Sequence, residues 1–278
     1  MYEDIELLNQ YGYKVIQVRG RSNKYFVGDR KFERPKIQVL MNAVGAAKFL
    51  TEKKTTVLTQ KIAELLGASQ AEQLTEALAV DDNKHSNERI YYSIDEITSA
   101  LLNKKQISFV YFDYGQNMEK LYRKDKNRYI VNPLGLVYSG ENFYLVCFHD
   151  KYKDVANYRI DRMEDVKEEK KNVTKLKKFE NFHINEYKRF IFAMYSGEKE
   201  EVGLIFPKDL LNMAVDRFGE NIEPIRYGEN EYIVKATVIV SKTFFAWLTT
   251  FEGRVKINAP NNIKEQYRAF VKSVLDLI

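Results

Sequence analysis

Residues 128–163 read RYIVNPLGLVYSGENFYLVCFHDKYKDVANYRIDRM, and this stretch decides the fold of the chain. Two clusters of turn-forming residues, at 139–142 and 149–151, divide it into three parts. The middle part, Phe143 to Phe148, is an apolar run with the length of a buried strand. Pro133 and Gly135 punctuate the first part. We therefore predict three short strands joined by tight turns.

Two further strands are predicted before this stretch, which makes five between residues 106 and 163. Residues 106–114 alternate, with Ile107, Phe109 and Tyr111 on one face. Residues 119–128 carry five basic residues against two acidic ones. Such a run is typical of a solvated edge strand, but tyrosines lie among its basic residues, as in surfaces that bind single-stranded nucleic acid. Both interpretations stay open, with Lys120 and Arg123 as the candidate phosphate contacts.

Three separated motifs in this region resemble the WYL domain family, in which Trp-Tyr-Leu stands where this chain has Phe-Tyr-Leu at 143–145. Asn-Pro-Leu-Gly-Leu at 132–136 and Tyr-Arg-Ile-Asp-Arg-Met at 158–163 match the family's pattern in order and spacing. The resemblance implies a small β-barrel, similar to SH3 and Sm barrels, over residues 106–170. It also implies a ligand pocket of arginines and aromatic residues. Tyr152 and Ala156 stand where many members carry further arginines, so we expect a weaker pocket or a less charged ligand.

The predicted ligand site consists of five residues of this domain: Tyr111, Arg128, Tyr144, Arg159 and Arg162. Arginines can bind a phosphate through paired hydrogen bonds, and tyrosine rings can stack on bases. The expected ligand is therefore a short single-stranded nucleic acid or a nucleotide. Strand alternation projects residues 159 and 162 to opposite faces, so only strong curvature or a bulge would present both to one ligand, and otherwise one of them is structural. We favour Arg159 as the ligand contact, because Arg162 shares its face with apolar Ile160 and precedes the expected strand end. The alternative for both is a surface ion pair with a neighbouring carboxylate, which stabilises little.

Residues 1–34 are predicted to form part of a winged helix-turn-helix. By residue types alone, residues 13–27 are an ordinary hairpin with a charged tip. The resemblance favours a wing, because Tyr2 to Leu8 matches the end of the recognition helix in WYL regulators. Arg19, Arg21 and Lys24 would then contact DNA phosphates. Because the sequence contains only the end of that helix, we expect weak duplex binding with a steep salt dependence.

Residues 35–105 are predicted to be a helical linker region. Apolar residues recur at helical spacing from Ile37 to Val44, and again at Leu58, Ile62 and Leu65. Such stripes are usually core, but they exceed what a small bundle can cover. We therefore also predict a homodimer through this region or the C-terminal domain.

The C-terminal part is predicted to contain a connector, 171–197, and a domain, 198–278. The lysine-rich stretch 167–178 is interpreted as solvated connector. Predicted elements from residue 202 onward follow the order β-α-β-β-α-β, which is typical of a ferredoxin-like sandwich. This part also resembles the WCX domain that follows WYL domains, notably at Trp247-Leu248 and Phe251. Its aromatic stripe is expected to be core.

Composition limits the function classes. The chain has 278 residues and a formal net charge of +5, which permits nucleic-acid binding without requiring it. Cys147 is the single cysteine, as is typical of a reducing cytoplasm, and no apolar run approaches the roughly 20 residues of a membrane helix. There is no phosphate-binding glycine motif, metal-ligand spacing or nucleophile elbow, so we predict no enzyme, cofactor or metal site. His149, in a turn, is expected to face solvent.

These observations predict an α+β protein that acts as a ligand-responsive bacterial transcriptional regulator and senses a negatively charged effector. Its partners would be DNA, a nucleotide or single-stranded effector, and a second copy of the chain. The alternative is a nucleic-acid-binding accessory protein of a defence system, without a transcriptional role.

Overall fold

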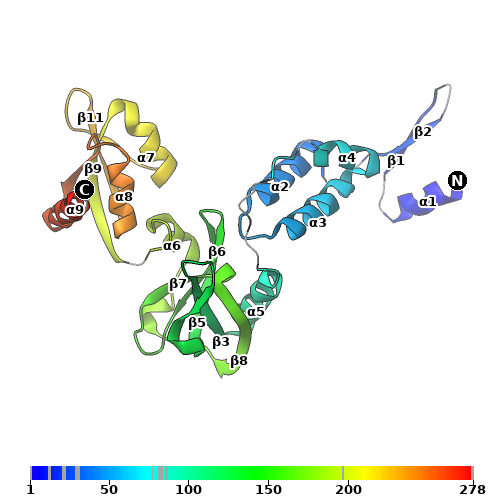
Figure 1. Ribbon diagram of the computed structural model, residues 1–278. Coiled ribbons are helices and arrows are strands. Elements are labelled where there is room, and N and C mark those ends of the chain that lie inside the picture. The colour runs from blue at the N-terminus through cyan, green and yellow to red at the C-terminus, as the bar shows by residue number, and fades with distance from the viewer. Residues whose placement is uncertain are drawn as a thin grey trace. The chain divides into compact units, whose positions relative to one another are not determined.

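The computed structural model describes residues 2–11, 14–20, 23–28, 32–76, 78–80, 84, 87–195 and 197–276. The chain separates into two compact units, 1–88 and 89–278. Both units mix helices and antiparallel strands (Figure 1). No described helix is long and apolar enough to cross a membrane.

The first unit contains a helix, a hairpin and a small helical bundle. Its elements are α1 (Tyr2–Gln10), β1 (Val15–Val18), β2 (Lys24–Val27), α2 (Arg34–Ala46), α3 (Glu52–Ala63), η1 (Glu64–Leu66) and α4 (Ala68–Glu76). Strands β1 and β2 pair antiparallel, as the hairpin prediction required. Thr51 caps α3, because its side chain accepts a hydrogen bond from the backbone N–H of Lys54 at 3.2 Å.

The bundle core only partly follows the predicted stripes. Ile37 and Met41 are buried in the core, as predicted for α2. The predicted stripe of α3 is only partly correct: Ile62 packs against this core, but the fully buried positions lie one residue further along the helix. Its buried face consists of Thr55, Thr59 and Ala63, whereas Leu65 is 56% exposed. The Thr59 hydroxyl donates to the Thr55 carbonyl oxygen at 2.9 Å, so a hydroxyl on the buried face is satisfied by the helix itself.

The second unit begins with a helix that packs on a curled antiparallel sheet. Its elements are α5 (Ile90–Asn103), β3 (Lys105–Tyr114), β4 (Lys120–Tyr122), η2 (Arg123–Lys126), β5 (Tyr129–Ser139), β6 (Asn142–Phe148), β7 (Val155–Arg159), η3 (Ile160–Arg162) and β8 (Met163–Asn172). The sheet order is β4-β3-β5-β6-β7, and β8 pairs with β3. Helix α5 lies against β3, β5 and β8 (Figure 1). The three strands predicted within residues 128–163 are confirmed.

Local irregularities curl this sheet. The β5–β6 register shifts between Pro133 and Gly135, and the β3–β8 register shifts twice. Such bulges bend a strand and increase its twist. One prediction for this region is wrong: residues 167–172 are not connector, because they continue β8, where alternating charged residues face solvent beside β3.

A polar cluster around the buried side chain of Asn132 joins β5 to the end of β8. Asn132 is fully buried; its side chain accepts from Gln106 at 3.0 Å and donates to Asp150 at 2.7 Å. Asp150 also accepts from Gln106 and from Lys171, each at 3.1 Å. Burial opposes ionisation of Asp150, but hydrogen bonds from Thr174, Asn132, Lys171 and Gln106 outweigh it and hold its pKa well below the usual range.

The C-terminal region contains a second sheet with helices packed on it. Its elements are η4 (Lys177–Phe179), α6 (Ile184–Phe190), β9 (Glu198–Pro207), η5 (Lys208–Leu210), α7 (Leu211–Phe218), β10 (Ile225–Arg226), β11 (Glu231–Val240), α8 (Lys242–Thr249), β12 (Lys256–Ala259) and α9 (Asn261–Leu275). The strand order is β10-β11-β9-β12, and every neighbouring pair is antiparallel. Ser241 caps α8 by accepting a hydrogen bond from the Phe244 N–H at 3.2 Å. Phe244, Phe245 and Leu248 are buried, which confirms the predicted aromatic core.

Candidate ligand pocket of the curled sheet

A pocket of about 470 Å³ lies on the curled sheet beside β7. The residues that line it come from β3, η2, β6, β7, η3 and the segment that follows α6: Tyr111, Arg123, Tyr144, Asn157, Tyr158, Arg159, Arg162, Ala193, Met194 and Tyr195. The pocket therefore brings together four of the five residues predicted to bind ligand, together with Arg123 from the predicted nucleic-acid set.

The end of β7 explains why both arginines of the third motif reach this pocket. The strand ends at Arg159, and residues 160–162 form a 3₁₀ turn. Ile160 and Asp161 are buried within that turn. Strand alternation therefore stops before residue 162, and the prediction that Arg159 and Arg162 lie on opposite faces is wrong. Both line one cavity.

Arg159 is held in place by its own neighbours. Its Nε and Nη2 donate to the two carboxylate oxygens of Asp161 at 3.0 and 2.9 Å, and Nη2 also donates to Asn142 at 2.9 Å. The Asp161 side chain is only 2% exposed. A buried carboxylate in a two-point pair with a guanidinium fixes the direction of both groups. Arg159 therefore enters the pocket as a rigid, largely neutralised group.

Arg162 is held less completely. Its Nη1 donates to Asp113 at 3.2 Å, and its Nε is buried with no hydrogen-bond partner among the described residues. Asp113 also accepts two hydrogen bonds from Arg123, at 2.6 and 3.1 Å. These bonds from Arg123 hold the pKa of the Asp113 carboxyl below its usual value. Three arginines against Asp113 and Asp161 leave the pocket with one formal positive charge.

Tyrosine rings form a second part of the pocket lining. Tyr111 is buried, its ring lies 5.1 Å from that of Tyr158, and the Arg123 guanidinium lies 5.0 Å from it. Burial raises the pKa of the Tyr111 hydroxyl. Tyr144 is half-buried, whereas Tyr195 is 60% exposed. Tyr195 was not among the predicted site residues; it comes from a segment far along the chain, and no motif marked it.

The segment 193–195 is tied to β7. The Asn157 side chain donates to the Met194 carbonyl oxygen and to the Tyr187 hydroxyl, both at 2.8 Å. Ala193 and Met194 have φ angles of 46° and 60°, in the left-handed region that residues other than glycine rarely adopt. One wall of the pocket is therefore a backbone segment in an unusual conformation, held by a side chain of the opposite wall.

The other predicted site residues lie elsewhere. Arg128 does not line the pocket; it donates to Ser108 and forms an ion pair with Asp165. Lys120 pairs with Glu164 at 2.5 Å, beside the ring of Phe112. In the other unit Arg19 and Lys24 are exposed at the hairpin, and Arg21 lies outside the described residues.

His149 differs from the prediction. Its Nε2 lies 2.8 Å from the Tyr158 hydroxyl, and its ring contacts those of Tyr129 and Tyr152. Burial lowers the pKa of this imidazole. His149 therefore joins the aromatic cluster that includes Tyr158, a residue that lines the pocket. Across the described part of the chain, no group of three or more His, Cys, Asp or Glu side chains is arranged to hold a metal ion.

Comparison with known proteins is consistent with this geometry. The family profile of the WYL domain matches residues 93–168, which include most of α5 and of the curled sheet and both arginines of the third motif. No curated protein matches the chain.

Two solved structures are similar over most of the chain. Proteasome accessory factor B/C (PafBC) of Arthrobacter aurescens is 17% identical, with a TM-score of 0.33 over 92% of this chain and 37% of its own, so this chain spans little more than a third of PafBC. A protein described as CRISPR Cas-related is 15% identical, with a TM-score of 0.42 over 90% of this chain and 75% of its own. The profile match identifies residues 93–168, which carry the three motifs, as a WYL domain.

Proposed function

We propose that the WYL domain binds a phosphate-bearing ligand, a nucleotide or a short single-stranded nucleic acid, in the pocket beside β7. The chain would act as a ligand-responsive bacterial transcriptional regulator. The observation that carries this proposal is the state of Arg162, whose Nε is buried without an acceptor next to a second guanidinium and tyrosine rings. The Arg162 guanidinium lines the pocket and donates to Asp113 through Nη1, so a phosphate oxygen can accept hydrogen bonds from the N–H groups that it presents to the pocket.

The residues of the pocket favour binding over catalysis. None of the ten described residues that line it is a carboxylate, histidine, cysteine or serine. Guanidinium groups and tyrosine rings instead supply hydrogen bonds to phosphate and faces for base stacking. In this proposal Arg162 is the main hydrogen-bond donor to the phosphate. Arg159, which Asp161 holds in place, forms part of the wall of the site. This reverses the preference for Arg159, which assumed that Arg162 shares a strand face with Ile160: Ile160 is buried in the 3₁₀ turn, whereas Arg162 lines the pocket.

The remaining domain assignments belong to the same proposal. A helix followed by an antiparallel hairpin with exposed Arg19 and Lys24 supports a wing that contacts DNA phosphates. The strand order β10-β11-β9-β12 supports a ferredoxin-like, WCX-type domain at 198–278, joined by a connector. Residues 35–105 would link the DNA-binding end to the sensor, and a homodimer would present two such ends.

The proposed mechanism is a shift between two arrangements of the chain. A ligand in the pocket contacts β7 and residues 193–195 together, so it favours the arrangement in which these walls are correctly spaced. A ligand shifts such an equilibrium only by its difference in affinity for the two arrangements. The regulatory readout would be a change in duplex binding by the N-terminal unit.

The test is a titration of fluorescein-labelled single-stranded oligonucleotides and nucleotides into the full chain. Arg162→Ala should lose roughly 1.5–3 kcal/mol of binding free energy, a ten- to hundredfold loss of affinity, because one charge-assisted phosphate contact disappears. Arg254→Ala, a surface arginine paired with Asp209, makes the same change in net charge and should bind normally. Circular dichroism checks folding. Equal affinity of a folded Arg162→Ala variant and the unchanged chain would refute the proposal.

A second candidate is a nucleic-acid-binding accessory protein of a defence system. The pocket chemistry favours it equally, because binding at Arg162 and Tyr195 does not require a DNA-reading domain. Duplex binding separates the two functions: a regulator changes its duplex affinity when the pocket ligand is added, whereas an accessory protein does not.

A further inference from the structure

Strand β11 has one edge that its own sheet leaves largely open. On one side, β9 pairs with all ten residues from Glu231 to Val240. On the other side, β10 is two residues long and pairs only with Tyr232 and Ile233. Within the described chain, no strand pairs with this edge beyond residue 233.

The hydrogen-bond pattern shows which backbone groups face this edge. The Tyr227 N–H donates to the Glu231 carbonyl oxygen at 2.9 Å, so the backbone of Glu231 faces the β10 side. In an antiparallel sheet this direction alternates from residue to residue. The N–H and C=O groups of Lys235 and Thr237 therefore face the open edge, and those of Ala236 face β9. None of the described residues makes a hydrogen bond to these outward backbone groups.

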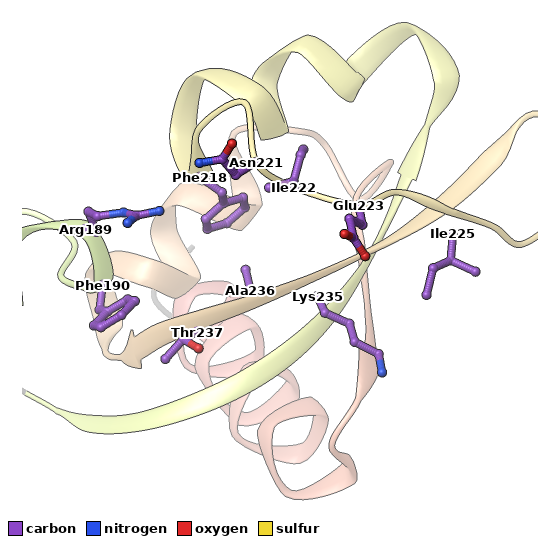
Figure 2. Close-up of a pocket in the computed structure, with 10 residues that line it drawn as sticks. All are labelled: Arg189, Phe190, Phe218, Asn221, Ile222, Glu223, Ile225, Lys235, Ala236 and Thr237. Carbon is purple, nitrogen blue, oxygen red and sulfur yellow. The ribbon is translucent and has the colours of Figure 1, made fainter. Parts of the chain in front are cut away.

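A recess of about 450 Å³ lies along this open edge. Figure 2 shows Phe218, Asn221 and Ile222 on the α7 side of β11, and Arg189 and Phe190 near the Thr237 end. Glu223, Ile225 and Lys235 lie toward the other end (Figure 2). The recess thus combines an apolar wall with unpaired strand backbone.

The charges in the recess are separated along the edge. Lys235 and Glu223 lie at one end, where their opposite charges balance, and Arg189 lies at the other (Figure 2). Arg189 is exposed. An acidic side chain is therefore favoured at the Thr237 end of the recess.

We propose that this edge binds an extended peptide segment of a partner protein, which adds to the sheet as a strand beside Lys235 and Thr237. The outward N–H and C=O groups of Lys235 and Thr237 are spaced as in a strand, and another extended backbone carries hydrogen-bond donors and acceptors at the matching spacing. Alternate side chains of the peptide would meet Phe218 and Ile222, and an acidic side chain would meet Arg189. A single strand enters such a recess, whereas a strand already packed in a second folded copy would carry its own helices against Phe190 and Phe218.

The first part of the test measures the unliganded full chain by amide hydrogen exchange with NMR detection. The amides of Lys235 and Thr237 should exchange quickly, and those of Ala236 and Val238 slowly, because the latter bond to β9. Slow exchange at both Lys235 and Thr237 in the unliganded chain would show that the edge is already satisfied, and would overturn the proposal.

The second part uses a phage-displayed library of short linear peptides, selected on the full chain and then synthesised. Bound peptides should be enriched in acidic residues and should protect the Lys235 and Thr237 amides. N-methylation of one alternate set of peptide residues should weaken binding roughly tenfold or more, and methylation of the other set should change it less than about twofold, since only one set faces β11. Selected peptides that bind without protecting these amides, or equal loss in both methylated series, would overturn the proposal. Protection produced by dimerisation alone would overturn it in favour of a second copy.

A variant of the chain provides the matched control. Thr237→Pro removes an N–H that faces the open edge and leaves the bonds to β9 intact, so it should abolish peptide binding while oligonucleotide binding at Arg162 persists. Arg189→Ala should weaken only peptides that carry the acidic residue. If Thr237→Pro does not fold, the N-methylated peptides still test the proposal, because they are measured on the unchanged chain.

Discussion

Replacing Asp113 by asparagine should strengthen, not weaken, the binding of a phosphate ligand. Asp113 accepts hydrogen bonds from Arg162 and Arg123, so its carboxylate competes with any phosphate for the same guanidinium groups. Asparagine keeps the shape and one acceptor but removes the negative charge. The two arginines would then meet the ligand with their charge uncompensated by this neighbour.

The size of the gain follows from Coulomb's law. A phosphate that contacts Arg162 would lie roughly 6 Å from the Asp113 carboxylate, and two unit charges at that distance repel by about 2.8 kcal/mol at an effective dielectric constant of about 20. The Asp113 side chain is 36% exposed, so solvent screens part of this repulsion. We expect a gain of roughly 1–2 kcal/mol, which is about a five- to thirtyfold increase in affinity.

The assay is fluorescence anisotropy of a labelled short single-stranded DNA at low and moderate salt, with the gain largest at low salt. Asp209→Asn is the control, because it makes the same change in net charge at an exposed pair with Arg254 in the C-terminal region. That variant should bind almost as the unchanged chain does. Unchanged or weaker binding by a folded Asp113→Asn protein would show that the ligand does not approach Arg162, and the reasoning would fail.

Four further predictions test other parts of the chain. Asp150→Asn should lower the free energy of unfolding by about 1–2 kcal/mol at neutral pH, a modest figure because the side chain is 42% exposed. Since folding lowers the pKa of Asp150, its contribution is present above the unfolded value of about 4 and lost as pH falls below it, so urea titrations of variant and unchanged chain should converge in acid. Arg19→Ala with Lys24→Ala should reduce the slope of log affinity against log salt for duplex DNA by nearly one per residue removed, and an unchanged slope would exclude a phosphate-contacting wing. Phe206→Ala, in the fully buried core of the C-terminal sheet, should cost about 3–5 kcal/mol in thermal or urea unfolding, and a loss under about 1 kcal/mol would contradict the packing. Light scattering at micromolar concentration should show a homodimer, whereas monomer alone would count against the proposed dimer.

The sequence was sufficient where local patterns and tertiary structure agree. The strands within residues 128–163 were predictable, because turn residues act within a few positions. The aromatic core around Phe244 followed from helical spacing alone. Tyr111, Tyr144 and the two arginines of the third motif, which the prediction grouped with Arg128, line one pocket, whereas Arg128 does not.

Other features depend on contacts that no short pattern reveals. The 3₁₀ turn at 160–162 ends strand alternation because Ile160 and Asp161 are buried together, and this placed Arg162 beside Arg159. Two threonines lie on the buried face of α3 in place of the expected aliphatic side chains, and the helix backbone satisfies the hydroxyl of Thr59. Tyr195 reaches the pocket only through the path of the chain after α6.

The backbone at Ala193 and Met194 has a consequence for how the pocket is controlled. These residues hold a costly left-handed conformation, and the carbonyl oxygen of Met194 is fixed by Asn157 of β7, across the same cavity that Arg162 lines. A ligand that contacts both walls stabilises this left-handed conformation by its binding free energy. Thermodynamic linkage makes this coupling equal in both directions. If a partner that binds near the start of β9 changes the conformation of residues 193–195, it changes the ligand affinity by some factor, and the ligand changes the affinity for that partner by the same factor. The C-terminal region would thus influence the ligand affinity of a pocket whose arginines all belong to the WYL domain.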